Sequence, residues 1–162
     1  MTNYDVMQIV PIIGALPMGD LTYSPALMLL HTNLQQINAE IEEQRRILIT
    51  DARKGAEVPD DFDERLSKYE ERRKNAAAEE RMPEAEGDAE FVEIYNKVIG
   101  LFSPAWAELM GQAAKLRFKL LTPEQFAALY AAVKAGPAEL PVGAEKIPAD
   151  IALTAVAGLL VA

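Results

Sequence analysis

A run of about thirty residues near the start of the chain has the spacing of one long helix. Ser24 and Pro25 precede the run as N-cap and first-turn residues, and Gly55 follows it as a C-terminal signal. The apolar positions inside it recur at alternating intervals of three and four, a coiled-coil-like pattern: Leu27, Leu30, Leu34, Ile37 and Ile41. The spacing predicts a helix over residues 25–54, about 45 Å long at ~1.5 Å per residue.

A second helix is expected over residues 60–81, after a turn at residues 55–59. Phe62, Leu66 and Tyr69 share one side of it, and pairs such as Glu64 and Lys68 place an acid four residues before a base. A short loop between two such helices favours an antiparallel αα-hairpin. We expect the tip of this hairpin to stand in solvent.

The rest of the chain has the pattern of a smaller helical domain. After an acidic hinge at residues 84–87, helices are expected over residues 88–102 and 104–120, separated at Pro104 and packed together. A third begins at the capping box of Thr122 and Gln125. Residues 136–148 should be an extended loop. Residues 149–162 fit either a helix or a buried strand.

These elements predict an all-α protein in three parts. Residues 1–23 form an apolar N-terminal arm, and residues 24–83 a projecting helical hairpin. Residues 84–162 form a small helical domain with an extended loop and an apolar C-terminal segment.

Charge and composition argue against several partners. The chain carries 25 acidic and 16 basic side chains, a net charge of −9 that repels phosphate backbones. The basic spots at residues 72–74 and 115–119 form no continuous stripe, so no nucleic-acid partner is expected. The apolar ends are shorter than the roughly 20 residues of a membrane-spanning helix, so no membrane partner is expected. With no cysteine, the cytoplasm is the predicted location, or a virion if the chain is phage-encoded.

Catalytic constellations are sparse. The single histidine, His31, fits a packed or surface position, and one histidine without cysteine excludes the usual zinc and di-iron sites. No Gly-rich phosphate loop is present, and no cofactor is expected. An enzyme would need a helical pocket lined by Trp106, Tyr95 and Tyr130 with carboxylates as acid and base. We therefore expect a chain that is not an enzyme.

A non-catalytic interaction or assembly protein is the leading functional prediction. A long charged hairpin and apolar ends favour a phage-type virion component or assembly factor within that class. The alternative is an acidic inhibitor that occludes a host enzyme or mimics nucleic acid. Its contact surface would be the acidic clusters at residues 57–64 and 84–93.

The two apolar ends are the predicted contact surface for a protein partner or a homo-oligomer. Residues 1–37 contain only two charged side chains, Asp5 and Asp20, and such ends need covering. The candidate contact residues are Val6, Ile9, Val10, Ile12, Ile13, Leu16, Ile151, Leu153, Val156, Leu159 and Leu160. Alternatively, the two terminal segments pack on each other within one chain.

Overall fold

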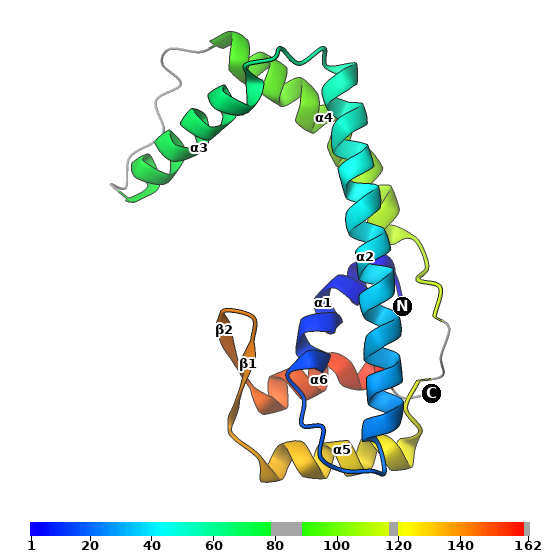
Figure 1. Cartoon of the computed structure of the whole chain (residues 1–162). Helices are drawn as coiled ribbons and strands as arrows, with labels where there is room; N and C mark the ends of the chain where they lie inside the picture. The colour runs from blue at the N-terminus through cyan, green and yellow to red at the C-terminus, as the bar shows by residue number, and fades with distance from the viewer. Residues whose placement is uncertain (79–88, 117–119, 161–162) are drawn as a thin grey trace. The chain divides into compact units, whose positions relative to one another are not determined.

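The computed structural model describes residues 1–78, 89–116 and 120–160, without the side chains of residues 76–78 and 158–160. It confirms an all-α protein, since 73% of these residues are helical and the remainder includes one two-stranded antiparallel sheet. Figure 1 shows the elements in chain order: α1 (Asn3–Gly14), α2 (Ser24–Gly55), α3 (Phe62–Ala78), α4 (Ala89–Gly111), α5 (Pro123–Ala135), β1 (Glu139–Val142), β2 (Glu145–Pro148) and α6 (Ala149–Leu160).

The helices group into two compact units. The terminal unit contains Met1–Glu43 and Leu109–Ala162, and the middle unit contains Gln44–Glu108. This grouping differs from the three parts expected from the sequence, because the apolar stripe of α2 is buried in the terminal unit. Leu27, Leu30 and Leu34 are each fully buried there. The first half of the predicted hairpin helix therefore belongs with both ends of the chain.

The terminal unit is built around α6. This helix contacts α1, α5 and both strands, and it buries Ala152, Leu153 and Val156. The expected N-terminal arm is instead the helix α1, which begins with a reciprocal capping box between Thr2 and Asp5. Residues 149–160 form a helix, so the strand alternative for this segment is wrong.

The start of the chain is tied to the end of α4. Asn3 Nδ2 donates a hydrogen bond of 2.8 Å to the carbonyl oxygen of Leu109. The backbone N–H of Asn3 donates to Gln112 and that of Ala114 donates to Met1. These bonds draw residues 112–114 into a bridge with the N-terminus after α4 ends at Gly111. The predicted helix to residue 120 is therefore wrong, although residues 117–119 lie outside the described part.

The break predicted at Pro104 is also wrong, because α4 runs through this residue. Proline inside a helix removes one backbone hydrogen bond and costs about 3 kcal/mol. Packing on both sides of Pro104 offsets that cost. Phe102 and Trp106 stack with their ring centroids 5.8 Å apart, while Phe91 and Val98 are buried nearer the start of the helix.

The core of the middle unit combines three helices. The last turns of α2 contribute Ala52, the start of α3 contributes Phe62, and α4 contributes Phe91 and Val98. The Phe62 and Phe91 rings lie 5.3 Å apart, and Arg65 lies over the Phe91 ring. The thin apolar face of α3 is thus completed by α4 and by the guanidinium group of its own Arg65.

The extended loop expected at residues 136–148 is a β-hairpin. Val142 pairs with Glu145 across a two-residue turn, and Gly143 has φ of 64°, as a type II′ turn requires. In this register the nitrogens of Pro141 and Pro148 face the outer edges of the sheet. Both edges are therefore protected against strand addition.

Candidate partner-binding surface

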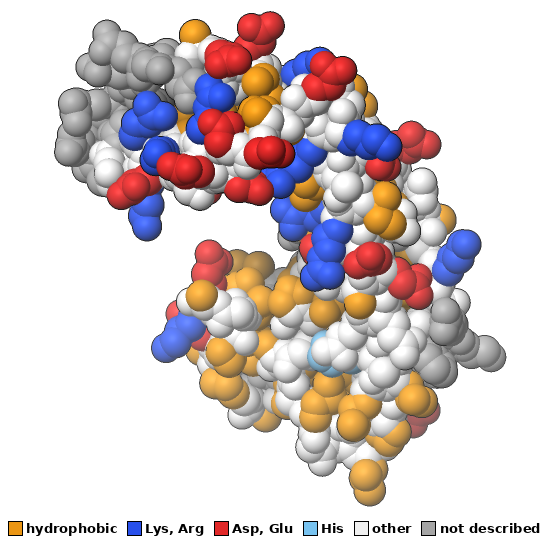
Figure 2. Space-filling view, turned by 45° about the horizontal axis from the view of Figure 1, so that its top comes forward, with side chains coloured by type: hydrophobic (Ala, Val, Ile, Leu, Met, Phe, Trp, Pro, Cys, Tyr) orange, Lys and Arg blue, Asp and Glu red, His pale blue; other side chains and the backbone are white. Residues whose placement is uncertain are grey.

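The two units differ strongly in charge. By sequence, the terminal unit has 9 acidic and 5 basic side chains in 97 residues, whereas the middle unit has 16 and 11 in 65. Figure 2 shows this contrast as mixed red and blue on one unit and mostly orange and white on the other. The terminal unit is thus where a largely uncharged contact surface could lie.

The turn between α1 and α2 holds an apolar side chain out in solvent. Leu21 is 89% exposed. Before it, Asp20 Oδ1 accepts a 2.7 Å hydrogen bond from the backbone N–H of Thr22, as in an Asx-turn. After it, the buried Tyr23 donates its hydroxyl to the carbonyl oxygen of Pro17 at 3.0 Å. Side-chain hydrogen bonds therefore stabilise the turn on both sides of Leu21.

The electrostatics of this turn follow from the same contacts. The Thr22 N–H lowers the pKa of Asp20, so this carboxylate stays charged and keeps its bond. Burial, with a smaller effect from Asp20, raises the pKa of Tyr23, so its hydroxyl remains a donor. Both hydrogen bonds persist across the neutral pH range.

The exposed side of α2 continues from this turn. Ser24 N–H donates to the Asp20 carbonyl and Leu27 N–H to the Tyr23 carbonyl, so the turn at residues 21–23 leads directly into α2 at Ser24. Met28 is 58% exposed and Leu29 is 53% exposed. We call this exposed set the uncharged face: Leu21, Pro25, Met28, Leu29, Thr32, Gln35 and Gln36. No Asp, Glu, Lys or Arg occurs in residues 21–39.

Ser24 does not have the capping role expected of it. Its hydroxyl is buried and has no hydrogen-bond partner among the described residues. The carbonyl groups of Asp20 and Tyr23 begin the helix instead. The N-cap prediction for Ser24 is therefore wrong.

The predicted contact residues at the chain ends lie mainly in the core. Six are at most 3% exposed within the chain itself: Val6, Ile9, Ile13, Leu16, Leu153 and Val156. The terminal helices α1 and α6 contact each other, as in the alternative that the sequence left open. A partner would reach these six side chains only if the core opened. The surface described above therefore excludes them.

The other five candidates at the chain ends differ in exposure. Val10 and Ile12 are half-buried, whereas Ile151 is 58% exposed on α6. The side chains of Leu159 and Leu160 lie outside the described residues. Binding of a partner at any of these positions stays a prediction.

Candidate catalytic groups are dispersed. His31 is half-buried beside the end of α1, where a Cβ on Gly14 would lie 3.3 Å from its Cε1 atom. Within the described ranges, no three His, Cys, Asp or Glu side chains come together as a metal site would require. Tyr95 packs on Tyr69, and Trp106 stacks on Phe102.

The acidic cluster at residues 57–64 is largely paired. Asp63 binds Arg53 at 2.7 Å, and Glu64 binds Lys68 at 2.6 Å, which lowers the pKa of Glu64. Asp61 lies 3.9 Å from Arg65. In the second cluster, residues 84–88 lie outside the described part. Three of the five carboxylates in the first cluster therefore have a basic partner within the chain, although their side chains remain exposed.

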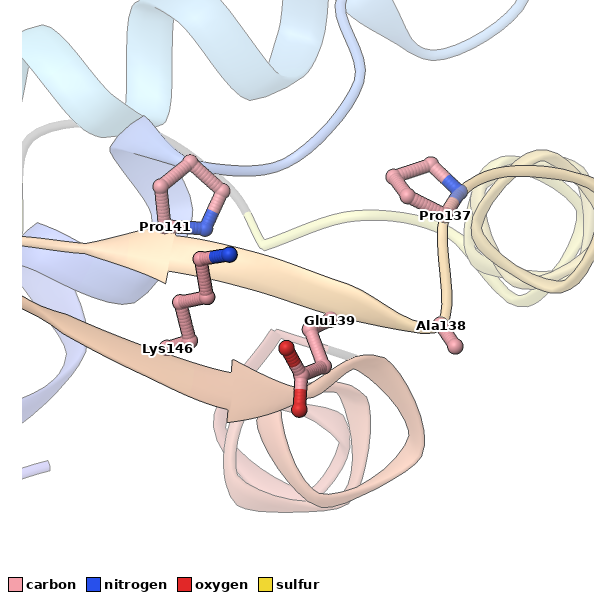
Figure 3. Close-up of a pocket in the computed structure, with 5 residues that line it drawn as sticks. All are labelled: Pro137, Ala138, Glu139, Pro141 and Lys146. Carbon is pink, nitrogen blue, oxygen red and sulfur yellow. The ribbon is translucent and has the colours of Figure 1, made fainter.

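Two hollows flank the start of the β-hairpin. One, of about 230 Å³, is lined by Ala15, Pro17, Val133, Gly136, Pro137, Leu140 and Pro141. The other, of about 470 Å³, is lined by Pro137, Ala138, Glu139, Pro141 and Lys146. Figure 3 shows that the Lys146 amino group points toward Pro141, whereas the Glu139 carboxylate points away from it.

Neither hollow has the character of a small-molecule site. Such sites combine an apolar lining with polar groups that converge on the ligand, and Glu139 and Lys146 are exposed and turned apart. The aromatic residues proposed for an enzymatic pocket, Trp106, Tyr95 and Tyr130, line neither of them. The uncharged face is therefore the stronger candidate site.

Comparison with known proteins adds no assignment. Within the described residues, no helix combines the length and apolar character needed to cross a membrane. No protein-family model matches the chain, and no match to it was found among curated proteins or solved structures.

Proposed function

We propose that this chain is a non-catalytic interaction protein that binds a protein partner through the uncharged face. The observation that carries the proposal is Leu21, held 89% exposed by hydrogen bonds on either side of it. A leucine in a loose turn could fold back onto the protein. Hydrogen bonds on both sides of Leu21 instead hold the turn in a conformation that leaves this side chain exposed.

The exposed apolar side chains of the uncharged face can still gain free energy by burial. Covering a leucine or methionine side chain fully is worth about 1.5–3 kcal/mol relative to leaving it in water. Leu21, Met28 and Leu29 are each more than half exposed, so a partner that covers all three gains several kcal/mol before ordering costs. The absence of Asp, Glu, Lys and Arg from residues 21–39 matches the depletion of charged residues at the core of protein interfaces.

The paired carboxylates favour this proposal over the acidic inhibitor. A nucleic-acid mimic needs unpaired anionic groups, and Asp63 and Glu64 each have a basic partner within the middle unit. An assembly factor or small virion component of phage type fits better, because repeated copies or subunits meet through apolar contacts.

A pair of charge insertions tests the proposal. Leu29→Glu places a charge within the uncharged face, and Ile99→Glu makes the same change at a 41% exposed position on α4. Both proteins, with wild type, are used to capture binders from an extract of the native source, and circular dichroism checks that each is folded. We expect Leu29→Glu to lose binders that Ile99→Glu and wild type retain. Identical binders for all three would contradict the proposal.

A further inference from the structure

The start of the chain occupies hydrogen-bonding groups that a longer α4 would use itself. The N–H of Ala114 donates to the carbonyl oxygen of Met1 at 3.1 Å. The carbonyl oxygen of Leu109 accepts a bond of 2.8 Å from Asn3 Nδ2. In a helix each N–H bonds to the carbonyl group four residues earlier. Ala114 has one backbone N–H to donate, so the bond to Met1 and a longer α4 exclude each other.

The residues that follow α4 have a strong local preference for helix. Residues 112–116 are glutamine, alanine, lysine or leucine, which are all good helix formers. Ala113 and Leu116 would continue the apolar side of the helix from Leu109. Lys115 would add a positive charge to the last turn, where the helix dipole favours one and where α4 has none. Local preference and observed structure therefore disagree in this segment, as they often do at elements that change conformation.

The N-terminus provides the contacts that keep this segment out of the helix. Thr2 has the extended backbone of an N-cap, with φ of −97° and ψ of 171°, and this conformation also allows its bridge to Ala113. Asp5 accepts hydrogen bonds of 2.7 and 2.9 Å from the N–H and the hydroxyl of Thr2. Asn3 is only 8% exposed, so its amide needs the Leu109 carbonyl as a partner. The start of α1 and the end of α4 are thus stabilised by the same contacts.

We propose that residues 112–116 are a two-state element, which either pairs with the N-terminus as in the structure or continues α4 by a further turn. Residues 1–3 are the strap that selects between the two states. While the strap is bound, α4 ends at Gly111. When the strap is withdrawn, the helix extends and the connection to α5 becomes shorter. This inference does not depend on the function proposed for the uncharged face.

Weakening the strap in the full-length protein tests the proposal. Asn3→Ala removes the side-chain bond to Leu109. The loss of one buried hydrogen bond should raise the ratio of extended to paired protein by about five- to thirtyfold. The Cα chemical shifts of residues 112–116, measured by NMR, should therefore move toward helical values. Circular dichroism checks that the variant keeps its other helices.

A second substitution separates helix extension from simple fraying. The side chain of Ala113 is exposed, and its bridge to Thr2 uses only the backbone. Ala113→Gly should therefore affect the paired state little, whereas glycine disfavours the helical state by about fivefold relative to alanine. Added to Asn3→Ala, it should lower the ratio of extended to paired protein by about that factor.

A third variant favours the extended state without touching the strap. A Cβ at Gly111 would meet no atom within 4 Å, and the same holds for Gly100 within α4. Gly111→Ala should increase helical shifts at residues 112–116 and speed the exchange of the Asn3 side-chain amide with solvent. Gly100→Ala, the matched control, should change neither.

Three results would overturn the inference. The first is a set of Cα shifts at residues 112–116 that keeps its wild-type values in Asn3→Ala or moves to those of a disordered chain. The second is helical shifts in Asn3→Ala that the added Ala113→Gly leaves unchanged. The third is a gain of helix in Gly111→Ala while the Asn3 amide stays as protected as in wild type, because the two states would then not compete.

Discussion

Replacing Leu153 with alanine should cost the terminal unit about 2.5–4 kcal/mol of unfolding free energy. Leu153 lies on α6 and is 2% exposed. Removal of three carbon atoms at about 0.8 kcal/mol each gives roughly 2.4 kcal/mol, and the cavity left behind adds to this loss. Ile151, two residues earlier on the same helix, is 58% exposed. Its replacement by alanine should cost only about 0.5 kcal/mol, because little burial is lost and alanine favours helix.

Urea unfolding followed by circular dichroism at the helical minimum measures both variants against wild type. Leu153→Met is the matched control, since it keeps side-chain volume and should cost less than about 1.5 kcal/mol. Leu153 is part of the chain's own core. Equal and small losses for Leu153→Ala and Ile151→Ala would refute that assignment and would return Leu153 to the set of partner contacts.

Three further changes test other contacts. Asn3→Ala removes the 2.8 Å bond to Leu109 and should lower stability in urea by about 1–2 kcal/mol; no loss would show that this bond does not hold the N-terminus. Thr2 hydrogen bonds keep the pKa of Asp5 below its ordinary value of 3.8. The stabilisation that Asp5 provides is therefore complete above pH 3.8 and is lost as the pH falls through the lower pKa of the folded state. Asp5→Asn should therefore reduce the loss of stability at acid pH in unfolding measured against pH. An unchanged acid dependence would exclude this role of Asp5. Pro104→Ala restores a backbone donor inside α4 and should raise stability in urea by up to about 3 kcal/mol; a loss would mean that the proline ring is itself needed for packing.

Local signals predicted the helices whose ends are set by their own residues. The helix expected over residues 25–54 is α2, Ser24–Gly55, within one residue at each end. The capping box expected at Thr122 and Gln125 is present, with both reciprocal hydrogen bonds. In both cases the determining interactions join residues a few positions apart, so a sequence pattern contains them.

Long-range contacts set the features that the sequence did not reveal. The end of α4 depends on backbone bonds between residues 1–3 and 112–114, and no local pattern encodes a bond across more than a hundred residues. Pro104 was expected to end a helix, yet packing on both sides of it keeps α4 continuous. The capping box of Thr2 and Asp5 was present in the sequence as a local signal for the start of α1, but this helix was not predicted.

The sequence predicted the uncharged face only in part. The low charge of residues 1–37 indicated an apolar contact region, but not which side chains the chain would cover itself. Val6 and Leu21 are similar in hydropathy, and the fold buries the first completely while it leaves the second 89% exposed. The sequence contained one signal for this face. The first half of the predicted helix at residues 25–54 contains no charged residue on either side, although the solvent side of an amphipathic helix is normally charged.

Oxidation of Met28 tests most directly whether the uncharged face is covered by a partner. Mild peroxide converts exposed methionines to sulfoxides, and mass spectrometry can compare the tagged protein in an extract of its native source with the same protein pure and dilute. Met28 is 58% exposed, whereas Met110 is 9% exposed and serves as the internal reference. We expect Met28 to oxidise several-fold more slowly in the extract, relative to Met110, than in the dilute protein. An unchanged ratio of the two rates would contradict the claim that this face is a binding surface.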